Sequence, residues 1–149
     1  MSITSIITVN FHQAEVTIDF LKSVAKSYSS TEVEIIIVDN GAEKNRKLIF
    51  QPYFSNIKYI QSKENLGFAG GNNLGIKQAK GDYIFLLNND TEIPAGCIET
   101  MIAAMEANHQ IGLLSPLLLY FDEKNCLAKM YGFKGGFIIQ NQYCLPNKI

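Results

Sequence analysis

Apolar residues in this chain gather in short runs that alternate with amphipathic stretches. Runs rich in β-branched residues predict strands at 3–10, 33–41, 57–62, 83–89 and 111–120. Between them, apolar residues at helical spacing predict helices over 15–30, 70–81 and 94–110, and the polar stretch 42–54 is also expected to be helical. Strands that alternate with helices in this way favour an α/β fold with a doubly wound, mostly parallel sheet flanked by helices.

The second apolar run and the C-terminal tail differ from this alternating pattern. The run at 33–38 is apolar at nearly every position, which is typical of a strand covered on both faces. In the tail, two short apolar runs at 129–133 and 136–143 are separated by glycines and predict a short β-hairpin. With 149 residues, the chain is interpreted as one domain, 1–149.

Charge and cysteine content exclude several classes of protein. Thirteen basic and fourteen acidic residues give a net charge of -1, which provides no general attraction for nucleic acid. The three cysteines match neither a zinc motif nor a disulfide framework. The longest apolar run, 111–121, is too short to span a membrane and contains Pro116. Because the N-terminus also lacks a secretory pattern, the expected location is the cytoplasm, including the inner face of the membrane.

Polar side chains follow several of the predicted strands. Asn10, Asp39 and the run 88–90 each come at the end of an apolar stretch, and the glycine-rich stretch 65–73 precedes a predicted helix. The carboxyl ends of parallel strands share one edge of a sheet, where α/β proteins bind ligands. A helix N-terminus at that edge favours an anion. We therefore expect a ligand site at this edge.

The glycine-rich stretch does not fit the two best-known nucleotide motifs. "GFAGGNN" lacks the GxGxxG spacing and follows a later strand, which argues against a dehydrogenase. Gly70 and Gly75 have P-loop spacing, but Ile76 and Lys77 follow in place of Lys-Ser/Thr. An anion at the helix and the isolated carboxylate of Asp90 are both satisfied by a diphosphate with a divalent metal, Mg²⁺ or Mn²⁺.

Four motifs occur in an order that resembles the inverting family 2 glycosyltransferases with the GT-A fold. They are "SIITVNFHQ", "EIIIVDNG", "NLGFAGGNNLGIKQAKGDYIFLLNND" and "IP", and the resemblance extends to Leu119. The form "NLGFAGGNN" is similar to the branch often described as rhamnosyltransferase-like. The resemblance implies transfer of a sugar from a UDP- or dTDP-sugar to a glycan or lipid-linked acceptor, as in polysaccharide biosynthesis.

The resemblance also implies roles for individual residues. Asp39 would accept hydrogen bonds from the pyrimidine base, and the run 88–90 occupies the family's DxD position, where Asp90 would bind Mn²⁺ or Mg²⁺. Asn88 replaces the first acid of DxD, and Asn72 stands where many members have arginine. The implied donor-binding residues are Asn10, Asp39, Asn65, Gly67, Asn72, Asn73 and Asn88.

The general base of such an enzyme is expected beyond Ile149, so the chain is interpreted as the donor-binding part, with the acceptor half largely missing. Asp122 and Glu123 are weaker candidates for the base. A homodimer is left open, and the alternative function is a non-catalytic nucleotide-diphosphate-binding module. A nucleotidyltransferase would need a basic, glycine-rich loop after the first strand, which "NFHQAEV" does not supply.

Simpler interpretations compete at several positions. Asp90 is also suited to be an N-terminal acid of the helix after Pro94, or a turn former with Thr91. Asp39 is suited to a turn with Asn40 and Gly41. Gly67, Gly70 and Gly71 are equally suited to backbone positions with positive φ or close packing and to close approach by a nucleotide, and the two roles are compatible. His12 is expected to be structural or exposed.

Overall fold

The computed structural model describes residues 3–116, which form a four-stranded sheet with helices on both faces. Its strands are β1 (Thr4–Asn10), β2 (Val33–Asp39), β3 (Ile57–Gln61) and β4 (Tyr83–Leu86), in the order β3-β2-β1-β4. Its helices are α1 (Ala14–Ser27), α2 (Lys47–Phe50), the 3-10 turn η1 (Gln51–Tyr53), α3 (Gly67–Ile76) and α4 (Cys97–Ala107). Every strand pair in this sheet is parallel, as the sequence predicts.

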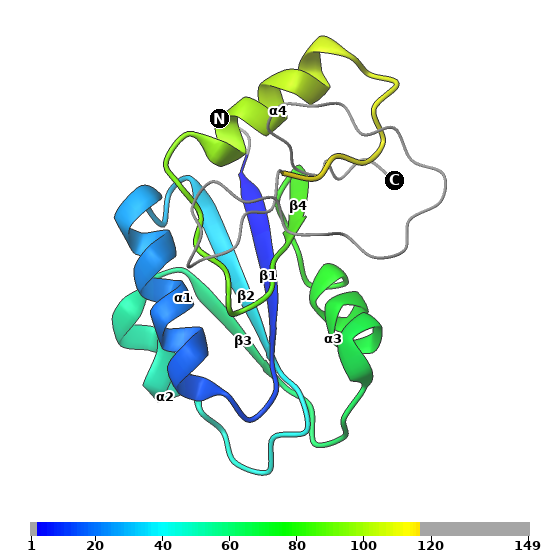
Figure 1. Cartoon of the computed structure of the whole chain (residues 1–149). Helices are drawn as coiled ribbons and strands as arrows, with labels where there is room; N and C mark the ends of the chain where they lie inside the picture. Colours follow the sequence, from blue (N-terminus) through cyan, green and yellow to red (C-terminus); the bar gives the residue numbers. More distant parts are fainter. Residues whose placement is uncertain (1–2, 117–149) are drawn as a thin grey trace.

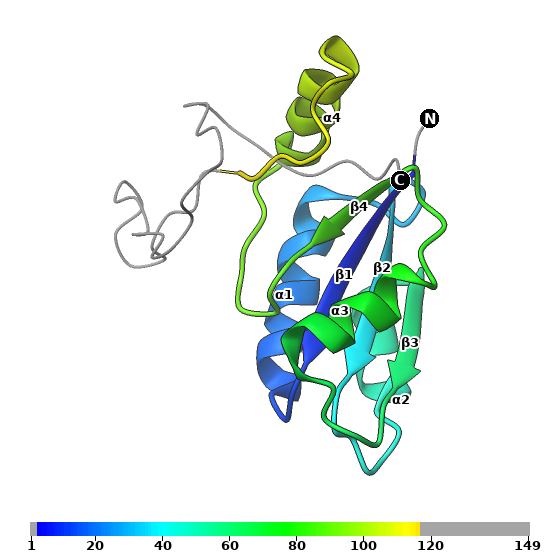
Figure 2. The same cartoon turned by 90° about the vertical axis from the view of Figure 1, so that its right-hand side faces the viewer.

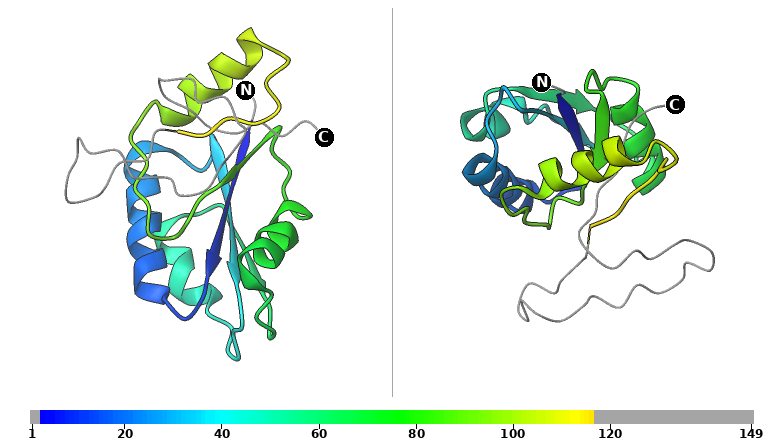
Figure 3. Two further views of the ribbon diagram at one scale, coloured as in Figure 1. Left: turned by 45° about the vertical axis from the view of Figure 1, so that its right-hand side comes forward. Right: turned by 90° about the horizontal axis from the view of Figure 1, so that it is seen from above.

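The helices place one layer on each face of the sheet. Helices α1 and α2 cover one face and α3 covers the other (Figure 1 and Figure 2). Helix α4 lies across the end of the sheet where β1 begins (Figure 3). Accordingly, the core has two parts: one around Ile6 and Ile35 under α1, and one around Ile7 and Ile36 under α3. All seven residues of β2 are buried, which confirms that this strand is covered on both faces.

Several predicted boundaries differ from the structure. The helix predicted over 94–110 begins only at Cys97, because Gly96 before it has a left-handed backbone with φ of 79°. The helix predicted over 42–54 is reduced to α2 and η1, and residues 42–46 form an irregular connection. The predicted strand 111–120 is wrong for 111–116, where Ile111 donates to the carbonyl of Asn108 in a turn. Residues 117–120, the predicted hairpin, Asp122 and Glu123 lie outside the described part.

Glycines bring α3 close to the sheet. A Cβ on Gly75 would lie 2.5 Å from Cγ2 of Ile7, and one on Gly71 would lie 3.0 Å from both γ-carbons of Val9. Close packing therefore explains Gly71 and Gly75. Gly67 instead has φ of 67° and open space around its missing Cβ, so its backbone conformation is what favours glycine there.

The Gly75→Ala variant is expected to lose about 1–3 kcal/mol of unfolding free energy, because overpacking against Ile7 outweighs the better helix propensity of alanine. Urea denaturation measures this loss. The control is Gly112→Ala, where an added Cβ meets nothing within 4 Å. If Gly75→Ala is as stable as the control, α3 does not contact β1 at this position.

Candidate functional site

The carboxylate of Asp39 is the centre of a hydrogen-bond network at the carboxyl edge of the sheet. It ends β2, beside Asn10 at the end of β1, and is fully buried. Oδ1 accepts from Nδ2 of Asn10 at 2.7 Å and from Nη1 of Arg46 at 3.0 Å. Oδ2 accepts from the hydroxyl of Tyr59 at 2.6 Å. All of these partners are donors, so Asp39 is held as a hydrogen-bond acceptor.

Tyr59 supports this network from β3. Its hydroxyl donates to Asp39 and accepts the backbone N–H of Arg46 at 3.0 Å. Burial of the phenol, together with its bond to the Asp39 carboxylate, raises the pKa of Tyr59 to about 12. The phenol therefore remains a donor to Asp39 at neutral pH.

The raised tyrosine pKa predicts a loss of stability at alkaline pH. A group with a higher pKa in the folded than in the unfolded chain stabilises fully below the unfolded value and loses that effect as pH rises through the folded value. For Tyr59 the window is from about pH 10 to about pH 12. We expect Tyr59→Phe to have a shallower decline of unfolding free energy across this window than the unmodified protein, measured by urea denaturation at stepped pH. The comparison variant is Tyr53→Phe, which lacks the contact with Asp39, and an equal slope in both variants would contradict the assignment.

A chain of hydrogen bonds connects Asp39 to the DxD-like turn. Nδ2 of Asn89 donates to the hydroxyl of Thr17 at 3.0 Å, and that hydroxyl donates to Oδ1 of Asn10 at 2.9 Å. Asn10 then donates to Asp39. Thr17 lies on α1 and is fully buried. The first turn of α1 thus fixes the turn at 88–91 relative to the buried carboxylate.

The turn at 88–91 presents its acid to the outside. The hydroxyl of Thr91 donates to the carbonyl of Asn88 and closes the turn, while Asn88 and Asp90 are exposed. Among residues 3–116, the Asp90 carboxylate has no hydrogen-bond or ion-pair partner. Because α4 begins only at Cys97, the interpretation of Asp90 as an N-terminal acid of that helix is wrong. The turn explains the backbone at Asp90 but leaves its charge without a structural role.

The segment after Asp90 is anchored to α1. Oγ of Ser23 accepts the N–H of Ile93 at 3.3 Å, and Oγ of Ser27 donates to the carbonyl of Ile93 at 3.0 Å. The hydroxyl of Tyr28 donates to the carbonyl of Pro94 at 3.0 Å, and burial raises the pKa of this phenol to about 12. These contacts hold the turn from its C-terminal side.

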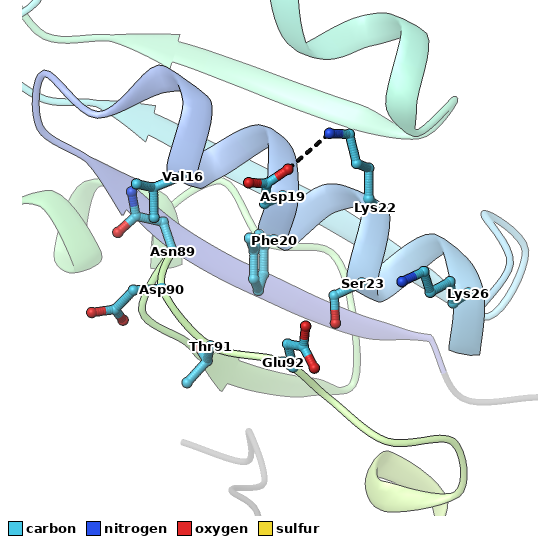
Figure 4. Close-up of a pocket in the computed structure, with 10 residues that line it drawn as sticks. All are labelled: Val16, Asp19, Phe20, Lys22, Ser23, Lys26, Asn89, Asp90, Thr91 and Glu92. Carbon is cyan, nitrogen blue, oxygen red and sulfur yellow. Dashed lines mark hydrogen bonds and ion pairs between the residues drawn. The ribbon is translucent and has the colours of Figure 1, made fainter. Parts of the chain in front are cut away.

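An open hollow of about 420 Å³ lies between α1 and residues 89–92 (Figure 4). Asn89 and Asp90 lie at one end of it, next to Val16. Along the rest of its length it carries charges of both signs: Asp19, Lys22, Lys26 and Glu92. The Asp90 carboxylate therefore borders a space large enough for a small polar molecule.

Two asparagines hold the N-terminus of α3 at the same edge. Oδ1 of Asn40 accepts the N–H of Leu66, and Nδ2 of Asn40 donates to Oδ1 of Asn65, both at 2.9 Å. Oδ1 of Asn65 also accepts the N–H of Gly67 at 2.9 Å. In the part of the chain that the structure describes, the next two N–H groups of this first turn, those of Phe68 and Ala69, have no internal acceptor. They are available to an anion.

The remaining predicted donor-binding residues lie on α3. Asn73 is exposed, whereas Asn72 is buried and its Nδ2 donates to the carbonyl of Phe68 at 3.0 Å within the helix. Asn10 and Asp39 are thus bonded directly and Asn65 is connected to Asn10 through Asn40, whereas the amide of Asn72 is bonded within α3. The roles of Asn72 and Asn73 at a nucleotide stay predictions.

Sequence reasoning missed three residues at this edge. Arg46 and Tyr59 contact Asp39 across 7 and 20 positions of sequence, and neither belongs to a motif. Phe11 is 46% exposed directly after Asn10, and its ring lies 3.2 Å from where a Cβ of Gly41 would be. The one available signal was an aromatic residue following the first strand. Phe11 gives the edge an exposed aromatic face between Asn10 and Gly41.

The residues present fit a divalent ion that is bound partly by the protein and partly by the oxygens of a diphosphate. Within residues 3–116 there is no group of three or more His, Cys, Asp or Glu that could hold an ion. Asp90 supplies one exposed oxygen donor group and Asn88 a neutral one. Mg²⁺ commonly takes one or two carboxylates and completes its octahedron with water and phosphate oxygens, and Mn²⁺ prefers the same oxygen donors. The donor set is thus suited to an ion that arrives with a phosphate ligand.

Comparison with known proteins assigns the family. The family model described as Glycosyl transferase family 2 matches residues 5–147. The chain belongs to this family. A cholesterol galactosyltransferase of Borreliella burgdorferi is 24% identical over 119 residues, which are 78% of this chain and 33% of that protein. A poly-beta-1,6-N-acetyl-D-glucosamine synthase of Staphylococcus epidermidis is 32% identical over 107 residues, or 70% of this chain and 26% of that protein.

Solved structures agree with this family assignment. TarS 1–349 of S. aureus in complex with UDP-GlcNAc has a TM-score of 0.63 and 25% identity, and the match covers 73% of this chain and 32% of that chain. TarS 1–349 alone gives the same TM-score with 26% identity. The predicted GT-A type α/β fold is confirmed by these neighbours together with the parallel sheet. This family 2 chain spans a third or less of the length of these relatives. In residues 3–116, no helix has the length and apolar character needed to cross a membrane.

Proposed function

We propose that this chain carries the donor-binding site of a metal-assisted, inverting glycosyltransferase that uses a UDP- or dTDP-sugar. The observation that carries the proposal is a hydrogen-bond chain at one sheet edge. It runs through Asn10, Thr17 and Asn89 from the buried acceptor carboxylate of Asp39 to the turn that holds Asp90, whose exposed carboxylate has no partner among residues 3–116. The family assignment and the UDP-GlcNAc bound by the similar TarS support a nucleotide-sugar donor.

The base of the donor is proposed to bind at Asp39. Uracil and thymine carry a ring N3–H, which matches a carboxylate that all its partners hold as an acceptor. The exposed ring of Phe11 next to Asn10 provides a face on which a flat base can stack. Cytosine has an acceptor at N3, so the same carboxylate would repel it.

The diphosphate is proposed to lie between α3 and the turn at 88–91. The N–H groups of Phe68 and Ala69 point out of the first turn of α3, where the helix dipole favours an anion. Asp90 would hold Mg²⁺ or Mn²⁺ with Asn88 beside it. When bound, such an ion supplies Lewis-acid stabilisation of the departing nucleoside diphosphate. Asn89 and Thr17 keep the turn in place for this role.

The acceptor and the sugar specificity are proposed from the family and from the named relatives, and not from contacts in residues 3–116. A glycan or lipid-linked acceptor is supported by the names of the relatives: a cholesterol galactosyltransferase, a poly-beta-1,6-N-acetyl-D-glucosamine synthase and a poly(ribitol-phosphate) beta-N-acetylglucosaminyltransferase. The rhamnosyltransferase-like branch rests on the form "NLGFAGGNN" alone. A general base for the acceptor hydroxyl, a second copy of the chain as partner and a place at the inner face of the membrane stay predictions. Donor binding without transfer is the alternative function.

A panel of nucleotides tests the donor proposal. Melting temperature is measured with UDP, dTDP, CDP and ADP, each with and without Mn²⁺. At a hundredfold excess over Kd, binding to the folded state stabilises by about 2.7 kcal/mol, which corresponds to about 5–10 °C for a domain of this size. We expect this shift for UDP or dTDP with Mn²⁺ and little for CDP. A panel in which no pyrimidine diphosphate raises the melting temperature, or in which CDP equals UDP, would contradict the proposal.

A further inference from the structure

Arg46 covers the carboxylate that the proposed function assigns to the base. Its Nη1 lies 3.0 Å from Oδ1 of Asp39, and its side chain is 25% exposed while that of Asp39 is 0% exposed. Arg46 lies on the irregular connection between β2 and α2, just before Lys47. The guanidinium is therefore the outward-facing partner of a carboxylate that solvent does not reach.

A nucleobase cannot contact a fully buried carboxylate unless one of its present partners moves. Asn10 is 0% exposed, ends a central strand and is held by Thr17. Tyr59 belongs to β3, and its ring packs against that of Phe50 with centroids 6.2 Å apart. Among the partners of Asp39 in residues 3–116, Arg46 is the one on an irregular segment, and its charged side chain is 25% exposed; Tyr59 is also partly exposed but is fixed in β3. Displacing Arg46 thus disturbs the least structure.

We propose that Arg46 is a displaceable cap on Asp39, and that the base of the donor takes the place of its guanidinium. The inference rests on the proposed function, because it assumes a base at Asp39. In the free protein the ion pair satisfies the buried carboxylate. On binding, the ring N3–H of the base replaces Nη1 at Oδ1 and the guanidinium turns to solvent. Arg46 acts on the ligand through Asp39 and is a positioning residue that lowers affinity.

The proposal predicts the opposite of what an arginine in a nucleotide site would ordinarily do. A guanidinium that contacts phosphate strengthens the binding of UDP, and its loss weakens it. A cap competes with the ligand, so loss of the cap strengthens binding. The gain in affinity is as large for a nucleoside without phosphate as for the nucleoside diphosphate. Uridine, which has no phosphate, separates the two roles from each other.

The test compares Arg46→Gln with the unmodified protein in titrations with uridine and with UDP, both without metal, followed by ¹H–¹⁵N NMR. In Arg46→Gln the ligand no longer has to break the charge-assisted hydrogen bond of the partly exposed pair. We therefore expect this variant to bind both ligands about three- to tenfold more tightly than the unmodified protein. Lys44→Gln is the matched control, since it removes the same charge from the same connection and Lys44 is exposed. In the control we expect unchanged uridine affinity and UDP affinity that is unchanged or lower.

Arg46→Lys is the second variant, because a lysine keeps a cation over Asp39 and preserves folding if glutamine does not. It is expected to bind uridine within about twofold of the unmodified protein if the cation is the cap. In Arg46→Gln, weaker binding of UDP with unchanged binding of uridine would assign Arg46 to the phosphates. Weaker binding of both ligands would make Arg46 a direct or structural support of the site. Either result overturns the proposal that Arg46 is a cap.

If the unmodified protein binds uridine and UDP, the proposed function stands whatever the Arg46 variants do. If no variant binds either ligand, the proposed function and the cap fail together.

Discussion

The Asp39→Ala variant is expected to be about 3–5 kcal/mol less stable than the unmodified protein, because removing one partner of a buried, hydrogen-bonded ion pair leaves the others unsatisfied. Asn10 and Tyr59 would keep buried donors without an acceptor, and Arg46 would lose its ion pair. Urea denaturation at pH 7 measures the difference. The control is Asp82→Ala, which removes an exposed carboxylate in the bend directly before β4 and is expected to change stability by less than about 0.5 kcal/mol.

The Asp39→Asn variant separates stability from binding. An asparagine keeps the shape of the side chain, and the Tyr59 hydroxyl can turn to accept from the new amide, so a folded protein is expected. A neutral acceptor makes weaker hydrogen bonds than a carboxylate, so affinity for uridine is expected to fall about tenfold. Full uridine affinity in Asp39→Asn would remove Asp39 from the base site. A loss of stability in Asp39→Ala no greater than in Asp82→Ala would contradict the buried network itself.

The Asp90→Asn variant is expected to lose the part of UDP binding that depends on Mn²⁺, while keeping its stability and its metal-free affinity. Asp90 is exposed and has no partner among residues 3–116, so the substitution breaks no internal contact. Loss of the one carboxylate ligand is expected to weaken UDP binding in the presence of Mn²⁺ by at least about 10–100-fold, the range seen when residues that only support the ligands of a metal are changed. Calorimetric titration with UDP, once in the presence of Mn²⁺ and once in the presence of EDTA, measures the metal-dependent and the metal-free affinity.

Glu92→Gln provides the matched control for Asp90. It removes one exposed carboxylate from the same anchored segment, two positions further on, and lies along the same hollow. We expect it to keep the metal-dependent gain within about twofold, because its carboxylate is not at the DxD position. Equal losses in the two variants would show that general charge near the turn, and not ligation by Asp90, explains the effect of metal. No loss in Asp90→Asn would place the ion elsewhere.

The fold and the edge at which the site lies could be read from local sequence. The apolar run of β2 indicated a strand buried on both faces, and the polar residues after β1, β2 and β4 marked the edge at which parallel strands end. These signals are local because the pattern of consecutive residues determines the periodicity of a strand and the position of its end. The same locality explains why Asp39 and Asp90 were found as candidates.

The contacts within the site could not be read in this way. The bond from Arg46 to Asp39 depends on the path of an irregular connection, in a polar stretch that was expected to be helical. The link from Asn89 through Thr17 to Asn10 joins three elements over 79 positions, and no periodicity relates them. The late start of α4 depends on one left-handed glycine, Gly96. Such features are decided by tertiary packing, which a single sequence does not display.

Paramagnetic NMR with Mn²⁺ and UDP tests the central proposal most directly, because one experiment locates both the ion and the nucleotide on the uniformly ¹⁵N-labelled chain. With UDP present, Mn²⁺ is expected to broaden the amide signals of residues 88–91 first, and UDP with diamagnetic Mg²⁺ is expected to shift those of Asn10, Asn40, Phe68 and Ala69. Both effects then mark the edge that holds Asp39 and Asp90. Broadening centred elsewhere, or no change on adding UDP with metal, would contradict a donor site at this edge.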